Sequence, residues 1–182
     1  DLCDAEAMVA LKDLMARLQS PHLDCRQDGA AIDPTRRAGY LLNSTLAGLE
    51  TADAVLLVGS DPRAEAPLVA TRLRKAWATI GAKFAAIGPP ARLTHPVEAL
   101  GAGPSTLKEL ADGRHPFAEV LKNAKRPALI LGQGAIRRPD GTAVLATARR
   151  LAETAGLLRE GWDGFNLLHT AAARVGALEE DV

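Results

Sequence analysis

The segment Ala54 to Pro67 constrains the fold more than any other part of this sequence. It opens with a continuous apolar run, Val55 to Val58, which Gly59 interrupts and a polar turn follows. A short apolar run without alternation is typical of a parallel strand buried on both faces. Ligands of open α/β sheets bind beyond the carboxyl ends of such strands, and a glycine there lets a phosphate or another backbone come close. We therefore take Gly59 and the turn after it as the first candidate binding edge.

The same arrangement occurs a second time along the chain. The apolar run Pro127 to Leu131 ends in Gly132-Gln133-Gly134, and a further strand is predicted at Lys83 to Ile87. Helical periodicity follows both glycine turns, at Glu65 to Ile80 and at Thr142 to Ala155. Alternating strands and helices predict an α/β fold with a doubly wound, mostly parallel sheet and flanking helices, of the Rossmann-like class.

The whole chain, 1–182, is interpreted as a single α/β domain or domain fragment. Two strand, turn and helix modules span residues 44–88 and 127–156. A loop-rich connection covers 89–104, where four prolines and two glycines fall. Because the sequence starts with aspartate rather than an initiator methionine, we expect a fragment of a longer chain.

The remaining segments have weaker patterns. An amphipathic helix is predicted from a cap at Asp4 to Ser20, with an apolar stripe of Met8, Leu11, Leu14, Met15 and Leu18, and we expect its two methionines in the core. A short strand at His22 to Arg26 leads into a long polar loop across residues 26–40. Further helices are predicted at Leu41 to Glu50, capped by Asn43 or Ser44, at Ser105 to Leu110, at Pro116 to Ala124 and at Leu167 to Val175. For the helix that follows Gly59, the expected inner face is Leu68, Leu73, Ala76, Trp77 and Ile80.

Composition excludes several classes of function. Basic and acidic residues balance, 22 of each, so the basic excess of a nucleic-acid-binding face is absent. An aromatic content of 3% argues against stacking platforms for single strands. No apolar run approaches the roughly 18 residues that would span a bilayer, so we expect a soluble chain without membrane insertion. With 47% apolar residues, the chain is able to bury a core.

Metal-ligand patterns are missing as well. Cys3 and Cys25 stand alone, without a Cys-x-x-Cys pair, so neither a zinc site nor an iron-sulfur ligand set is predicted. We expect both thiols to be buried or half-buried in a reducing compartment. The four histidines lack metal spacing too. His95 and His115 each precede a proline, which favours loop or helix-start positions over catalytic ones.

The two glycine turns supply the candidate cofactor-binding residues. The third glycine of a dinucleotide fingerprint is missing because residue 137 is arginine, and no P-loop sequence occurs. Arg137 and Arg138 either hold a phosphate or form a solvated pair, and Asp61, Arg63 and Glu65 either read a ligand edge or begin a turn and a helix. The candidates, which we interpret as a vestigial binding edge, are Gly59, Ser60, Asp61, Arg63, Gly132, Gln133 and Gly134. No nucleophile, base and orienting residue can be assembled, so no catalytic residue is predicted.

Three phrases of the sequence resemble a known family. They are Leu23 to Gly29 (LDCRQDG), Gly48 to Arg63 (GLETADAVLLVGSDPR) and Gly164 to Leu178 (GFNLLHTAAARVGAL). These phrases resemble the large iron-sulfur subunit of bacterial NADH-quinone oxidoreductase, respiratory complex I, in its molybdopterin-oxidoreductase-like region. The likeness spans nearly the whole chain. In molybdopterin enzymes a Gly-Ser-Asn-Pro-like turn, matched here by Gly59 to Pro62, lies against the nucleotide part of the pterin cofactor. Asp61 replaces the asparagine and puts a negative charge where a phosphate would come.

The resemblance implies participation in an enzyme rather than catalysis by these residues. It implies a molybdopterin-oxidoreductase-type scaffold without the molybdenum cofactor, and iron-sulfur clusters in an upstream part of the parent subunit. The parent complex passes electrons from NADH through flavin and iron-sulfur clusters to quinone and couples this transfer to proton translocation. The implied partners are other peripheral-arm subunits of complex I. The implied location is the cytoplasmic side of the bacterial inner membrane.

Two other interpretations stay open at this point. The segment Arg126 to Ala135 also resembles the strand that opens the middle domain of thiamine-diphosphate enzymes, which implies a nucleotide-binding domain. The other interpretation is a structural module without any ligand, which overlaps with a locally inert part of a redox enzyme. Titration with nucleotides distinguishes a binding domain from an inert one.

Overall fold

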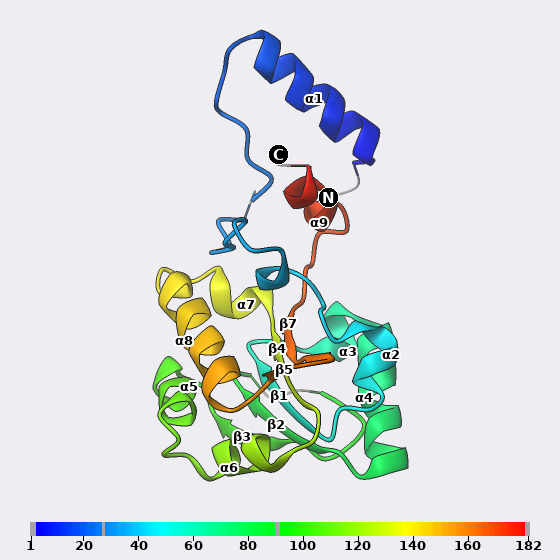
Figure 1. Cartoon of the computed structure of the whole chain (residues 1–182), viewed down its shortest axis with the longest axis vertical. Coiled ribbons are helices and arrows are strands. Elements are labelled where there is room, and N and C mark those ends of the chain that lie inside the picture. Colours follow the sequence, from blue (N-terminus) through cyan, green and yellow to red (C-terminus); the bar gives the residue numbers. More distant parts are fainter. Residues whose placement is uncertain (1–2, 27, 90–91, 181–182) are drawn as a thin grey trace.

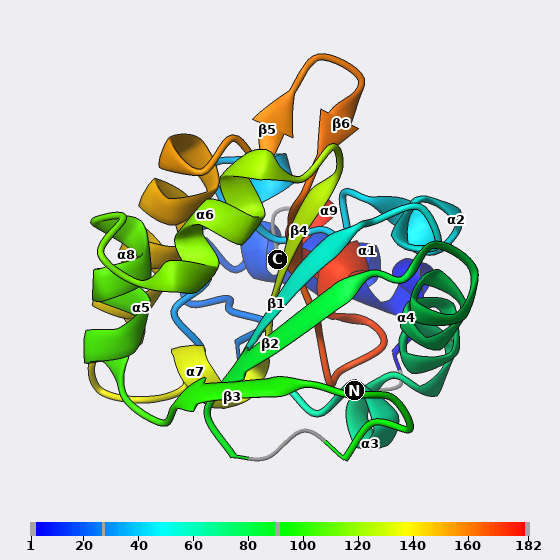
Figure 2. The same ribbon diagram turned by 90° about the horizontal axis from the view of Figure 1, so that it is seen from below.

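The computed structural model describes residues 3–26, 28–89 and 92–180. Its centre is a five-stranded parallel sheet with the order β3-β2-β1-β4-β7 (β3 to β4 in Figure 2, β7 in Figure 1). The strands are β1 (Ala54–Val58), β2 (Lys83–Ile87), β3 (Glu98–Gly101), β4 (Pro127–Leu131) and β7 (Phe165–Leu167). Val55 of β1 pairs with Phe84 of β2 on one side and Ala128 of β4 on the other. The predicted α/β fold with a parallel sheet and flanking helices is confirmed.

Helices cover both faces of this sheet (Figures 1 and 2). One face carries α2 (Thr45–Leu49) and α4 (Pro67–Ile80), and the other carries α5 (Pro104–Ala111), α6 (Pro116–Asn123) and α8 (Gly141–Thr154). Successive residues of β1 point into different layers, because Leu56 packs with the α5, α6 and α8 layer and Leu57 with the α2 and α4 layer. Burial on both faces explains why the strand is apolar without alternation.

Short elements complete the fold. They are a 3-10 helix (Arg37–Gly39), α3 (Pro62–Glu65), α7 (Gln133–Ile136), α9 (Arg174–Glu179) and an antiparallel hairpin of β5 (Leu158–Arg159) and β6 (Trp162–Asp163). Sequence patterns predicted neither the hairpin nor β3, since two-residue strands and an exposed edge strand carry no apolar run.

Several predicted helix ends are confirmed by their caps. The Asp4 carboxylate accepts a hydrogen bond from the backbone at the start of α1 (Ala5–Arg17), and His115 does the same for α6 through Nδ1. Gly81 ends α4 in the left-handed region, with φ +66°. The helix predicted from Ser105 begins one residue earlier, because Pro104 is the first residue of α5 and Gly103 is its cap position.

Helix α1 stands apart from the sheet and packs beside α9 (Figure 1). Its apolar stripe is only partly covered: Met8 is buried and Met15 is half-buried, whereas Leu11, Leu14 and Leu18 are exposed. The predicted core position is therefore confirmed for Met8 and only in part for Met15. Helix α1 does carry an apolar stripe, but the stripe does not belong to either core layer that covers the sheet.

The helix predicted at Glu65 to Ile80 is divided. Helix α3 ends at Glu65 and α4 begins at Pro67, and Ala66 between them is not helical, with φ −148° and ψ 76°. Proline disfavours the helical conformation of the residue before it, which explains the break. On α4, Leu68, Trp77 and Ile80 are exposed, contrary to prediction, while Leu73 and Ala76 are buried as predicted and Val69 joins them.

Three further predictions are wrong in whole or in part. No strand forms at His22 to Arg26, where Asp24 accepts hydrogen bonds from the Arg26 backbone and guanidinium and makes a turn. Helix α2 begins at Thr45 rather than Leu41, because Leu42 forms a bridge with Asn166. The predicted helix at Leu167 to Val175 is instead the end of β7, a loop and the start of α9.

Candidate functional site

The candidate site lies where β1, β2 and β4 end. Gly59, Gly88 and Gly132 follow these three strands directly. From β1 the chain moves outward through β2 to β3, and it then returns to the other side of β1 as β4. The carboxyl edge between β1 and β4 is therefore the topological switch point at which open α/β sheets bind ligands.

The glycine turns at this edge are packed against one another. A Cβ added to Gly132 would lie 2.3 Å from the Gly59 carbonyl oxygen, and one added to Gly59 would lie 2.7 Å from the Ala135 Cβ. Gly59 also has φ +57°, which disfavours any side chain. The backbone N–H of Gly59 donates to Ile87 and that of Gly132 donates to Val58. These glycines permit a close approach of protein backbone to protein backbone.

Ser60, Asp61 and Arg63 form a separate cluster with Glu65. The Glu65 carboxylate accepts from the Ser60 hydroxyl at 2.8 Å and from the Asp61 backbone N–H at 3.2 Å. The guanidinium of Arg92 donates to Asp61 at 2.9 Å, and Arg63 donates to the Arg92 carbonyl at 3.2 Å. A carboxylate of the protein therefore holds the hydroxyl and backbone donors that follow β1.

A shallow pocket of about 100 Å³ lies at the same edge, on the side of α5 and α8. Gly59, Gly88, Gly134, Leu107 and Arg138 contribute to its walls. Arg138 is the charged residue of this lining, and both of its hydrogen bonds go to Asp140, at 2.7 and 3.0 Å. Pockets for drug-sized ligands enclose roughly 300–1,000 Å³, so this one is smaller than such a ligand site.

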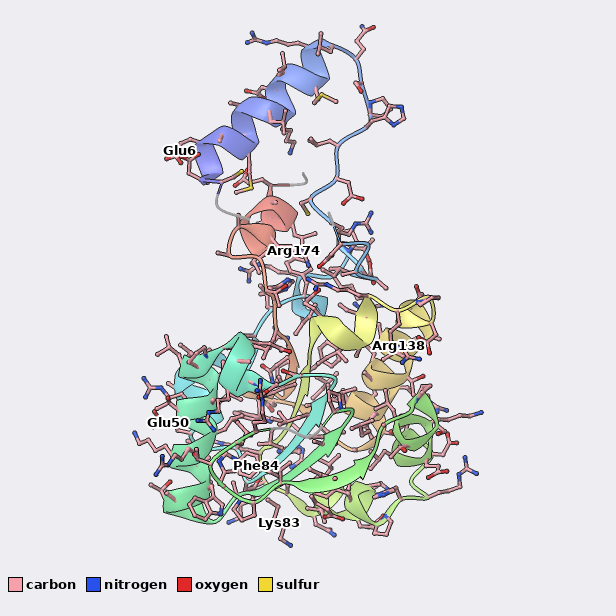
Figure 3. The ribbon with its side chains drawn as sticks, turned by 180° about the vertical axis from the view of Figure 1, so that it is seen from behind. Glu6, Glu50, Lys83, Phe84, Arg138 and Arg174 are labelled. Atoms are coloured by element: carbon pink, nitrogen blue, oxygen red, sulfur yellow. The ribbon has the colours of Figure 1, made fainter. Side chains whose placement is uncertain are left out.

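Gln133 belongs to a buried polar network rather than to the pocket. Its amide donates to the Leu168 carbonyl at 2.8 Å and accepts from Arg174 at 3.0 Å. Arg174 is itself buried and pairs with Asp28 at 3.0 Å, and Arg137 donates to the same carboxylate at 2.6 Å. Figure 3 shows Arg174 between α9 and the sheet domain. The network fastens the loop at residue 28 to α7 and α9.

The charge of Asp28 is stabilised by this network. Burial alone would raise its pKa, but hydrogen bonds from the Ala30 N–H, Arg174 and Arg137 outweigh that effect, so the pKa lies below its usual value. Arg137 therefore pairs with Asp28, and Arg138 pairs with Asp140. Neither guanidinium points from the glycine turn toward an open phosphate site.

The seven sequence-predicted residues therefore separate into three groups. Gly59, Gly132 and Gly134 meet at the strand ends, and Gln133 faces Arg174. Ser60 and Asp61 contact Glu65, and Arg63 contacts the Arg92 carbonyl beside them. Sequence reasoning missed Arg92, Asp28 and Arg174. Asp28 and Arg174 lie far apart in the sequence, and only the fold brings them together, so no local pattern could have identified the pair.

As the structure holds them, these residues do not fit a phosphate-bearing pterin cofactor. The donors after β1 are occupied by Glu65, one Asp61 oxygen is enclosed without any hydrogen-bond partner, and the glycine turns fill the edge. The Glu65 carboxylate would repel a phosphate placed beside these donors. Among residues 3–26, 28–89 and 92–180, no group of three or more histidine, cysteine, aspartate or glutamate side chains is placed to hold a metal ion.

Two surface findings complete the description of the site. Cys25 is half-buried, as expected, but Cys3 is exposed. The described helices include none whose length and apolar character would let it cross a bilayer.

Comparison with known proteins agrees with the fold. Residues 1–182 match the model of the molybdopterin oxidoreductase family. Across 98% of the chain, 43% of residues are identical to the mitochondrial NADH dehydrogenase [ubiquinone] iron-sulfur protein 1 of Solanum tuberosum, and 37% to an NADH-quinone oxidoreductase subunit of Rickettsia bellii. The aligned stretch is 24% and 26% of those proteins, so the chain spans about a quarter of their length.

A solved structure shows the same fold at low identity. It is the formyltransferase/hydrolase complex of Methylorubrum extorquens with methylofuran, which matches with a TM-score of 0.60 and 18% identity. The match covers 91% of this chain and 50% of that one. Because the family model covers the entire sequence and the parallel sheet agrees with it, the chain belongs to the molybdopterin oxidoreductase family.

Proposed function

We propose that the protein is a non-catalytic scaffold region of the iron-sulfur subunit of an NADH-quinone oxidoreductase. The filled carboxyl edge of the sheet carries this proposal, because the Glu65 carboxylate uses the donors at which a cofactor phosphate would bind. The relatives in potato and Rickettsia bear the names of such subunits, which supports the choice of complex.

In this proposal, electrons pass from NADH through flavin and iron-sulfur clusters to quinone outside this region, and the transfer drives proton translocation. The clusters need cysteine ligands, and the chain contains only two cysteines, so they bind to other segments of the subunit. The region contributes surfaces to other peripheral-arm subunits on the cytoplasmic side of the bacterial inner membrane. It binds neither a molybdenum cofactor nor a nucleotide.

Nucleotide titration tests the inert edge. ADP, GTP and NADH, each added at a concentration on the order of millimolar, should leave the melting temperature of the 182-residue chain unchanged. A ligand at a hundredfold excess over its dissociation constant would add about 2.7 kcal/mol, which a thermal scan detects easily. A saturable shift would contradict the proposal and would favour the nucleotide-binding domain suggested by Arg126 to Ala135. Arg138→Ala would then show whether the pocket at this edge is responsible.

Assembly tests the choice of complex. A tag on the gene product should co-purify NADH:quinone oxidoreductase activity from solubilised membranes and should migrate with it in a native gel. A tag that migrates apart from this activity would contradict membership of the complex, whatever the nucleotide titration shows.

A further inference from the structure

The exposed apolar stripe of α1 continues into a groove of about 140 Å³. With 3.6 residues per turn, Met8, Leu11, Leu14, Met15 and Leu18 fall within an arc of roughly 120° on the helix surface. Met8 and Leu11 line the groove from α1, Ala177 lines it from α9, and Leu23 and Cys25 line it from the intervening segment. Along the stripe, Leu11, Leu14 and Leu18 are 45%, 51% and 66% exposed.

Little of the described structure supports α1. The Met8 side chain packs near Gly176 of α9, and Lys12 donates to the Glu180 carbonyl at 2.5 Å. These contacts come from Met8 and Lys12, so only the last turn of the helix, beyond Lys12, extends away from the body (Figure 1). A helix of 13 residues is marginal in water without a tertiary partner, and three large exposed side chains in one stripe add to the need for one.

We infer that the α1 stripe and the groove beside it dock an amphipathic helix from additional polypeptide of the same protein. The occupant is a helix because Leu11, Leu14 and Leu18 repeat at the i, i+3, i+7 spacing of a helix-packing seam. The relatives are about four times as long as the stretch they share with this chain, which is the source of the occupant. This inference rests on the proposed function only in placing the chain within a larger subunit.

Tethering favours this occupant over a second copy of the chain. A segment on the same polypeptide is present at an effective concentration on the order of millimolar, so a modest apolar contact is enough to keep it docked. A separate copy gains no such advantage at cellular concentrations. The same stripe in an isolated chain would then remain open to solvent.

Hydrogen exchange tests the inference on the 182-residue chain and on the complete polypeptide encoded by its gene. The amides of α1 should exchange at least tenfold more slowly in the complete polypeptide, while those of β1 should be equally protected in both and report correct folding. Leu11→Gln combined with Leu14→Gln should abolish the added protection of α1. Val9→Gln, an exposed apolar position outside the stripe, should preserve it. Glutamine is nearly as good a helix former as leucine and better than valine, so neither variant loses much helix propensity.

Two results would overturn the inference. One is equal exchange of the α1 amides in the 182-residue chain and in the complete polypeptide. A gene that encodes no further polypeptide would overturn the inference in the same way. The other is protection in the 182-residue chain that rises with its concentration and accompanies dimers in sedimentation, which would identify a second copy as the occupant. Protection in the complete polypeptide without co-purified oxidoreductase activity would sustain the docking surface while contradicting the proposed function.

Discussion

His95 is a buried histidine whose ring has no hydrogen-bond partner among the described residues. Its ring centroid lies 4.3 Å from that of Phe84 and 6.0 Å from that of Trp77, and both ring nitrogens are enclosed. Burial, together with the nearby charge of Arg74, lowers the pKa of His95. The folded protein therefore favours the neutral ring more strongly than the unfolded chain does.

Stability should fall as the pH falls below the unfolded pKa of about 6.5, because the unfolded chain then binds a proton that the folded protein resists. His95→Leu should reduce the difference between the urea midpoints measured about one pH unit above and one unit below that value. His169, whose pKa burial also lowers, accounts for part of the remaining difference. The exposed His22→Leu serves as the control, and an equal pH difference in all three proteins would refute the role given to His95.

Arg174 is the residue on which the buried polar network depends. Arg174→Met should destabilise the protein by about 3 kcal/mol, because it leaves the Gln133 oxygen without its donor and Asp28 with one fewer cation. Arg138→Met, which removes a solvent-exposed pair with Asp140, should cost less than about 1 kcal/mol. Urea unfolding of both variants measures the difference, and similar losses would show that burial of the network adds nothing.

At the scale of elements, the turns after β1 and β4 can pack closely because Gly59 and Gly132 have no side chains. Gly132→Ala should cost about 3 kcal/mol or more, since the new methyl group would meet the Gly59 carbonyl and Ser60. Gly134→Ala should be tolerated far better, because its nearest contact would be 3.1 Å from a single oxygen. Denaturant midpoints test this ranking, which an equal response of the two positions would contradict.

Helix α1 should be dispensable for the sheet domain. Deletion of residues 1–20 removes one helix whose described contacts are with α9 and the groove, and none of the layers that cover the sheet. We expect the far-ultraviolet circular dichroism to lose one helix while the melting temperature changes by only a few degrees. A large fall in melting temperature would mean that α1 supports the core.

At the scale of the whole molecule, the two helix layers share one sheet, so they should unfold together. Trp77 reports on the α4 side, and Trp162, whose indole donates to the Pro127 carbonyl, reports on the hairpin beside β4. Single-tryptophan variants, made with Trp77→Phe or Trp162→Phe, should each show fluorescence and circular dichroism transitions with the same midpoint. Separate midpoints within one variant would identify an independent unit.

Structural features that depend on neighbouring residues could be predicted from the sequence, and contacts between distant segments could not. The apolar run at Val55 to Val58 predicted the buried sheet because burial on two faces leaves a local trace. Pro67 indicates a helix break at Ala66, but the apolar periodicity on both sides of it favoured one continuous helix. Nothing local revealed that Arg92 would meet Asp61 or that Asp28 would meet Arg174, since those contacts depend on how separate segments are placed.

Asn166 has a consequence for the synthesis of the chain. Its buried side-chain amide accepts a hydrogen bond from the backbone N–H of Ser44, 122 residues earlier, and donates to the Ser44 hydroxyl. It also donates to the carbonyl of Leu129, beside it in the sheet. At translation rates of roughly 5–20 residues per second, the ribosome needs about 6 to 24 s to travel between those positions. Strand β4 is made late in that interval, and until β7 follows it presents an unpaired edge, which is the state that a nascent-chain chaperone would encounter.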